Sequence, residues 1–145
     1  MPVFSHRVAL ATAVVLASLS GALADEVSYS AKLDSSSETP PNSSPATGEV
    51  DAKFDKSTDM LSWTVTYSGL TGPAIAAHFH GPAPTGKAAG VMVPLTGALD
   101  SPIKGSAKLT DDEVKALAEG LIYFNIHTAA NKGGEIRGQM IMSAN

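Results

Sequence analysis

The sequence contains no cysteine. Without cysteine, the chain has no disulfide bond to stabilise it and no thiolate to act as a nucleophile or as a soft metal ligand. A diacylated lipoprotein anchor also requires a cysteine at the cleavage site, so we expect no such anchor. The fold must therefore be stabilised by the packing of its core.

Basic residues are also few. The chain has 10 Lys and Arg residues against 14 Asp and Glu residues, and it contains no run of more than three like charges. Nucleic acids and anionic membrane surfaces bind basic patches, so we expect neither of them as a partner.

No apolar run is as long as the roughly 20 residues that span a bilayer. The most apolar stretch, Val8 to Leu19, follows Arg7 and precedes Ala22-Leu23-Ala24. A basic start, a short apolar stretch and small residues at A-x-A positions are typical of a secretory signal peptide. We predict a signal peptide at residues 1–24, cleaved after Ala24, and a periplasmic or secreted protein that is not inserted into a membrane.

Residues 25–145 are expected to form a single domain. They make up 121 of the 145 residues, a length that suits one hydrophobic core. The predicted leader contains Arg7 and no acidic residue, so its removal changes the formal net charge from −4 to −5.

Apolar and polar residues alternate along much of this domain. This period of two places one face of a strand on a core and the other face toward water. The alternating segments are residues 27–33, 50–54, 61–67 and, more weakly, 103–109. Four further runs are richer in apolar residues and predict strands covered on both faces: 74–80, 89–95, 121–128 and 135–142. About eight short strands separated by turn residues predict an all-β protein, an antiparallel Greek-key β-sandwich of the immunoglobulin or superoxide dismutase type.

One short helix is predicted after residue 110. Thr110 and Glu113 are spaced as in a capping box, and Val114 and Leu117 supply an apolar stripe. Gly120 is placed to end the helix in a left-handed conformation. We expect this helix to connect two strands.

Three of the four histidines lie in the predicted domain. His78 and His80 are two residues apart, so on a strand both imidazoles project from one face while Phe79 points to the other. His127 lies near the end of another apolar run, where it shares a face with Asn125. One histidine alone is more often explained by a local structural hydrogen bond, but this placement of three predicts a transition-metal site formed by His78, His80 and His127.

Imidazole ligands suit zinc, copper, iron and nickel. The Irving–Williams order favours copper among the divalent ions, with zinc as the other candidate. Three nitrogen ligands leave one coordination position for water, substrate or a fourth protein ligand. Met92 is a candidate thioether ligand, but a methionine on a strand is more often core filling.

The sequence resembles the CHRD domain, a module named after chordin that also occurs alone in bacterial exported proteins. Six motifs carry the resemblance in order along the chain: Leu33 with Glu38-Thr39-Pro40-Pro41; Ala46-Thr47-Gly48; Gly69-Leu70-Thr71-Gly72; Ala77-His78-Phe79-His80-Gly81-Pro82-Ala83; Tyr123-Phe124-Asn125-Ile126-His127-Thr128; and Gly134-Glu135-Ile136-Arg137-Gly138-Gln139. The chordin members of the family imply protein interaction and not catalysis.

The stretch from Gly69 to His80 is also similar to the strand of copper,zinc superoxide dismutases that carries two copper-binding histidines as H-x-H. This resemblance implies a Greek-key sandwich and makes copper more plausible. The chain departs from those enzymes because it has no disulfide pair and no zinc loop rich in histidine and aspartate.

A buried ion pair is a further prediction. Glu135, Arg137 and Gln139 alternate on one strand, and Glu38 precedes a rigid Pro-Pro turn. We predict that Arg137 forms a bidentate, partly buried pair with Glu38, which would connect the first loop to the last strand.

Three functions remain open from the sequence. The first is an envelope metal-binding protein, a copper carrier, buffer or resistance factor. The second is a protein-interaction module of the cell envelope whose histidines are structural. The third is an enzyme, either dismutase-like or a hydrolase, but the chain contains no G-x-S-x-G motif and no distinctive pair of carboxylates.

Overall fold

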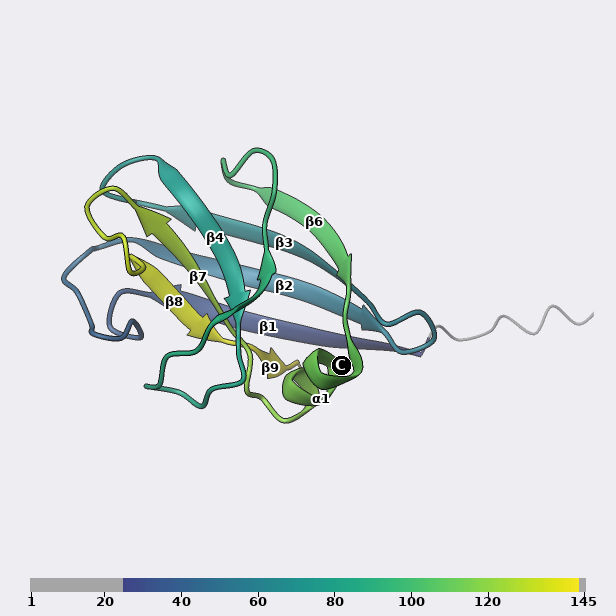
Figure 1. The fold of residues 1–145 in the computed structure, drawn as a ribbon. Coiled ribbons are helices and arrows are strands. Elements are labelled where there is room, and N and C mark those ends of the chain that lie inside the picture. Colours follow the sequence, from purple (N-terminus) through teal and green to yellow (C-terminus); the bar gives the residue numbers. More distant parts are fainter. Residues whose placement is uncertain (1–24, 144–145) are drawn as a thin grey trace, which may run out of the picture.

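The structure, a computed structural model, describes residues 25–143 as nine strands and one helix (Figure 1). Every strand pair is antiparallel. The elements are β1 (Glu26–Asp34), β2 (Thr47–Asp55), β3 (Met60–Ser68), β4 (Ala74–His80), β5 (Val91–Pro94), β6 (Ile103–Lys108), α1 (Asp111–Ala118), β7 (Tyr123–Thr128), β8 (Ile136–Gln139) and β9 (Ile141–Met142). The prediction of an all-β fold with one short helix is confirmed. The predicted signal peptide at residues 1–24 lies outside the described residues.

The strands form one continuous sheet in the order β5-β4-β7-β8-β1-β2-β3-β6, with β9 paired to β1. Strands β4 and β5 pair with each other, β6 returns to pair with β3, and β7 returns to pair with β4; these crossed-over returns make a Greek-key arrangement. Although β3 and β4 lie far apart in this order, the ring centroids of Trp63 and Phe79 are 5.1 Å apart. The sheet therefore folds over on itself as a sandwich, in which β4, β7 and β8 face β1, β2, β3 and β6 (Figure 1).

The core lies between these two halves. Val50, Ala52 and Phe54 of β2 all point inward, as the alternating pattern predicts. Opposite them, Phe79 and Phe124 are buried with ring centroids 4.8 Å apart in an edge-to-face contact. Because every second residue of a strand faces this core, the intervening residues are left on the outer faces of the sandwich.

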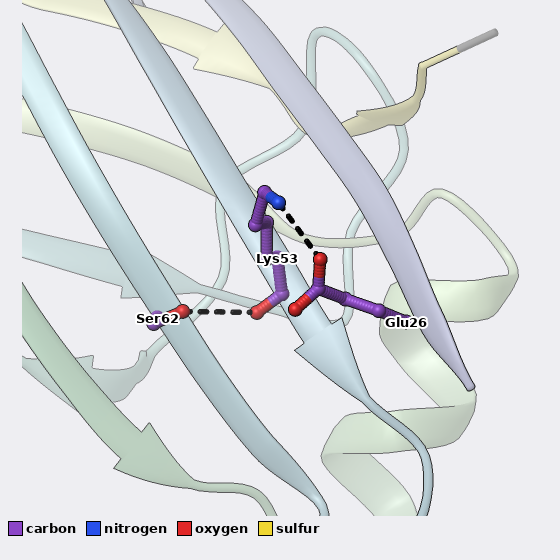
Figure 2. A network of polar contacts seen from close by, with 3 residues as sticks. All are labelled: Glu26, Lys53 and Ser62. Atoms are coloured by element: carbon purple, nitrogen blue, oxygen red, sulfur yellow. Dashed lines mark hydrogen bonds and ion pairs between the residues drawn. The ribbon is translucent and has the colours of Figure 1, made fainter. Parts of the chain in front are cut away.

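The outer face of β1, β2 and β3 is polar. Figure 2 shows Lys53 in contact with residues of both neighbouring strands: Lys53 Nζ lies 2.8 Å from Glu26 Oε1, and Ser62 Oγ donates to the Lys53 carbonyl oxygen at 3.5 Å. Exposed ion pairs of this kind contribute little to stability. This half of the sandwich is thus an ordinary solvent-facing sheet.

Helix α1 begins and ends as the sequence predicts. Glu113 N–H donates to Thr110 Oγ1 at 3.3 Å, and Thr110 N–H donates to Glu113 Oε2 at 2.8 Å, which completes the capping box. After the helix, Gly120 adopts a left-handed φ of 71°. Within the described part of the chain, no helix has the length and apolar character needed to cross a membrane.

Two predicted strands have the wrong bounds. The run 89–95 contributes only Val91–Pro94, because residues 81–90 form a loop after β4. The run 135–142 is divided at Met140, whose side chain is fully buried and whose N–H donates to Ile122 O at 2.9 Å. At this residue the chain leaves β7, since β8 pairs with both β7 and β1 whereas β9 pairs with β1.

Candidate metal centre

The three histidines lie on the outer face of the other half of the sandwich. His78 and His80 project outward from β4 because Phe79, between them, fills the core. On the adjacent strand β7, Phe124 and Ile126 fill the core, which leaves Asn125 and His127 on the outer face. In the register of these two strands, His78 lies directly opposite Asn125. The four side chains therefore share one small area of the sheet.

Two loops cover this outer face. All six residues of β7 are buried, as the apolar composition of this run predicts for a strand covered on both faces. Arg137 of β8 connects the two loops, since it donates to Thr39 Oγ1 at 2.9 Å in one loop and to Lys87 O at 2.7 Å in the other. The histidines thus lie in a partly dehydrated layer between the sheet and the loops.

The histidine nitrogens are close together. His78 Nδ1 lies 3.1 Å from His127 Nε2, and one nitrogen from each of the three rings lies within 4.8 Å of the others. His80 and His127 are 8% and 9% exposed, while His78 is half-buried. The structure therefore brings together all three residues that the sequence predicted, and His78 is the most open to solvent.

Backbone carbonyls fix the tautomer of two of the histidine rings. His80 Nδ1 lies 3.0 Å from Ala89 O, and His127 Nδ1 lies 2.9 Å from Lys132 O. A carbonyl oxygen only accepts, so in each neutral ring the proton is on Nδ1 and the lone pair is on Nε2. Such second contacts orient metal-binding histidines and raise their basicity as ligands.

The surroundings also favour neutral imidazole. Burial lowers the pKa of His78, and the neighbouring His127 and His80 lower it further. Burial likewise lowers the pKa of His80, against hydrogen bonds to Ala89 and Asn125 that act in the opposite direction. Because a metal ion binds the unprotonated ring, these shifts keep both ligands available near neutral pH.

The spacing fits a transition-metal ion. Two ligands with bonds of about 2.0–2.1 Å lie about 2.9–3.4 Å apart at bond angles of about 90–110°. The His78–His127 pair already has this separation, and the third nitrogen has to approach by something of the order of 1 Å. An all-imidazole set suits copper, zinc, nickel or iron, and it does not suit magnesium or calcium, which prefer oxygen ligands.

Sequence reasoning placed Asn125 on the face of His127 but gave it no role in the site, and it did not single out Tyr123. The Tyr123 ring stacks on the His80 ring with centroids 4.8 Å apart and planes 1° from parallel, and the Arg137 guanidinium carbon lies 3.4 Å from the Tyr123 centroid. Asn125 Oδ1 lies 2.9 Å from His80 Nε2. The alternation of Tyr123, Asn125 and His127 on one face was the available signal for both residues.

The predicted ion pair between Glu38 and Arg137 is wrong. Both side chains are buried, but the ion pairs found among residues 25–143 join other residues, and Arg137 uses its donors on Thr39 and Lys87. Glu38 instead lies against Gly134, close to the Asn125 amide. Burial raises the pKa of Glu38, while the Thr39 N–H, the Asn125 amide and the charge of Arg137 all lower it.

Glu135 serves a structural purpose. Its fully buried carboxylate accepts hydrogen bonds from Ser44 Oγ at 2.6 Å, from Thr71 N and Oγ1 at 2.8 Å each, and from Thr128 Oγ1. Burial acts to raise the pKa of Glu135, but these donors outweigh it and hold the pKa at about 2. The carboxylate therefore connects two loops to β7, and no cationic side chain within residues 25–143 forms an ion pair with it.

Met92, the candidate thioether ligand, is partly buried and packs against the core cluster. Its sulfur lies close to Gly81, where an added Cβ would be 2.7 Å from Sδ. This packing agrees with the interpretation that Met92 fills the core.

These observations define a class of protein: an all-β Greek-key domain with a buried cluster of three histidines on an outer sheet face beneath two loops. The chain belongs to the CHRD domain family, whose model matches residues 29–140 and so covers most of the chain. No curated protein and no solved structure matches the chain significantly. The resemblance expected from the six sequence motifs is thus confirmed for the family.

Proposed function

We propose that this protein is an exported metal-binding protein that holds copper at His78, His80 and His127 and acts as a carrier, buffer or resistance factor. The observation that carries the proposal is the convergence of three imidazoles from two strands, with His78 Nδ1 and His127 Nε2 3.1 Å apart. One hydrogen bond between two imidazoles explains the separation of that pair, but the approach of a third imidazole to within 4.8 Å of both favours a shared ion.

Copper is supported by the chemistry of the ligands. The chain has no cysteine, so the site offers imidazole without thiolate. Among divalent first-row ions such a set binds copper most tightly, and zinc is the next candidate. Export is supported by the pattern of residues 1–24, and it is tested by N-terminal mass spectrometry of the protein from its native host, which should find Asp25 as the first residue.

Calorimetric titration tests the site. Metal-free residues 25–145, which contain every described strand and the helix, should bind one equivalent of Cu(II) and, with weaker affinity, one of Zn(II). The variants His78→Ala and His127→Ala should each weaken Cu(II) binding by about 100-fold, since each removes one of three nitrogen ligands. Ser62→Ala, on the other half of the sandwich, is the matched control and should bind like the wild type.

Wild-type affinity in both histidine variants would contradict the ligand assignment. A superoxide assay on the copper-loaded protein then separates a carrier from a dismutase-like enzyme, because a carrier binds copper without turnover.

A second candidate function is a protein-interaction module of the envelope. The observation that favours it is the exposure of two apolar side chains on β9, Ile141 at 60% and Met142 at 61%. The same titration distinguishes the two candidates, because a module with structural histidines binds no transition metal tightly.

A further inference from the structure

Asn125 lies at the centre of the histidine cluster. It is opposite His78 in the strand register, two residues from His127 on the same face, and in contact with His80 through its side chain. The side chain is 3% exposed. No other polar side chain on β7 is a neighbour of all three histidines in this way.

The contact between Asn125 and His80 brings together two acceptor atoms. His80 Nδ1 donates its proton to Ala89 O, so a neutral His80 ring presents a lone pair at Nε2. The Asn125 amide oxygen, 2.9 Å from this lone pair, is also an acceptor. Two acceptors at this distance repel each other unless a proton or a metal ion lies between them.

The separation is the one that a shared metal ion produces. An oxygen and a nitrogen that bind one ion with bonds of about 2.0–2.2 Å at an angle of about 90° lie about 2.9 Å apart. The His78–His127 separation of 3.1 Å satisfies the same condition. Both close pairs in the cluster therefore have ligand-to-ligand geometry.

Glu38 determines which end of the amide faces His80. An added Cβ at Gly134 would lie 2.1 Å from Glu38 Oε1 and 2.7 Å from Asn125 Nδ2, so the carboxylate and the amide nitrogen are neighbours over this glycine. A carboxylate accepts and an amide NH2 donates, which turns Nδ2 toward Glu38 and Oδ1 toward His80. Glu38 Oε1 is buried and has no hydrogen-bond partner within geometric limits among residues 25–143, while the nearby Asn125 amide acts to lower the pKa of Glu38.

We propose that Asn125 is the fourth protein ligand of the metal centre, through Oδ1, and that Glu38 is the positioning residue that orients it. The inference rests on the proposed function, since it assigns a further ligand to the same ion. An amide oxygen is a harder ligand than imidazole, and hard ligands stabilise divalent ions relative to Cu(I), which prefers soft donors. Asn125 accordingly makes the site selective for Cu(II) and Zn(II) over Cu(I).

The test compares affinities for Cu(II), Zn(II) and Cu(I) in residues 25–145, measured by competition with chelators of known affinity. Asn125→Ala should weaken Cu(II) and Zn(II) binding by about ten-fold or more and Cu(I) binding by less than about three-fold. Each ten-fold fall in the ratio of Cu(II) to Cu(I) affinity raises the reduction potential of the bound copper by about 59 mV. Asn125→Asp keeps an oxygen at this position and should retain divalent binding.

Gln139→Ala is the matched control, because it removes an amide from β8 whose Nε2 donates to Ala83 O and Gly120 O, away from the histidines. This substitution should leave the ratio of Cu(II) affinity to Cu(I) affinity unchanged. Glu38→Gln should move that ratio in the same direction as Asn125→Ala but less, because the amide loses its orientation and not its oxygen. Circular dichroism checks that each variant is folded.

Equal losses of Cu(I) affinity and Cu(II) affinity in Asn125→Ala, or no loss of either, would overturn the inference. Asn125 would then be a residue that only packs against His80. Failure of the proposed function gives a different result. In that case the wild type binds no metal tightly, or the histidine variants bind as well as the wild type.

Discussion

His78 and His127 are 49 residues apart in the chain, and their Nδ1 and Nε2 atoms lie 3.1 Å apart in the structure. The contact depends on the antiparallel pairing of β4 with β7, which places Ala76 opposite His127 and His78 opposite Asn125. A shift of this pairing by one residue would turn one histidine into the core. The cluster is therefore a consequence of strand register.

Metal binding should stabilise the fold. An ion that binds only the native state adds about 2.7 kcal/mol at a free concentration 100 times its Kd. At roughly 4 °C for each kcal/mol, the melting temperature should rise by about 10 °C. Differential scanning fluorimetry with Cu(II), followed by excess EDTA, measures the rise and its reversal. His80→Ala is expected to show almost no rise, and a rise equal to that of the wild type would mean that the ion binds elsewhere.

Glu135 should make stability depend on pH in the acid range. The pKa of Glu135 is about 2 in the folded protein against 4.5 for an ordinary glutamate. Its contribution to the free energy of unfolding is therefore fully present above pH 4.5 and is lost as the pH falls toward 2. The difference of about 2.5 pKa units corresponds to about 3 kcal/mol. Urea unfolding of the wild type and Glu135→Gln between pH 2.5 and 7 should show the two curves converging as the pH falls.

Glu38→Gln is the control for this experiment, because burial shifts the pKa of Glu38 upward. The free energy of unfolding of the wild type relative to Glu38→Gln should increase as the pH falls. A raised pKa makes ionisation of Glu38 unfavourable to the fold, so this change is opposite to that for Glu135. Parallel curves for Glu135→Gln and the wild type over this range would show that the Glu135 carboxylate is not held ionised.

Gly134→Ala should destabilise the protein and weaken metal binding together. A Cβ at this position would lie 2.1 Å from Glu38 Oε1, and the φ of 129° is unfavourable for any side chain. We expect a loss of about 1–3 kcal/mol in urea unfolding. Gly133→Ala is the matched control, because a Cβ there meets no atom within 4 Å. Equal effects of the two substitutions would argue against a close approach of Glu38 to residue 134.

Thr110→Ala should lower stability without changing the metal centre. The substitution removes the acceptor for Glu113 N–H at the start of α1 and should cost about 1 kcal/mol. Urea unfolding measures the loss, and Thr110→Ser, which keeps the hydroxyl, should recover most of it. Cu(II) affinity should be unchanged, and a weaker affinity would indicate that the helix and the histidine cluster are coupled.

The local features of this protein follow from its sequence. Alternation with a period of two is a property of each strand alone, so the strands, the inward direction of Phe79 and the shared outward face of His78 and His80 could all be predicted. The capping box of α1 is also local, because its two hydrogen bonds join residues three positions apart. The family resemblance covers the same segments and agrees with the match to residues 29–140.

The tertiary structure alone decided which side chains meet across strands and loops. The sequence suggested a pair between Glu38 and Arg137, but the guanidinium binds Thr39 and Lys87, while Glu38 lies against Gly134. It also gave no sign that Asn125 would contact His80 from 45 positions away. Such contacts depend on strand register and loop closure, which are fixed by the packing of the whole domain, because charge and spacing within one segment do not determine the position of another.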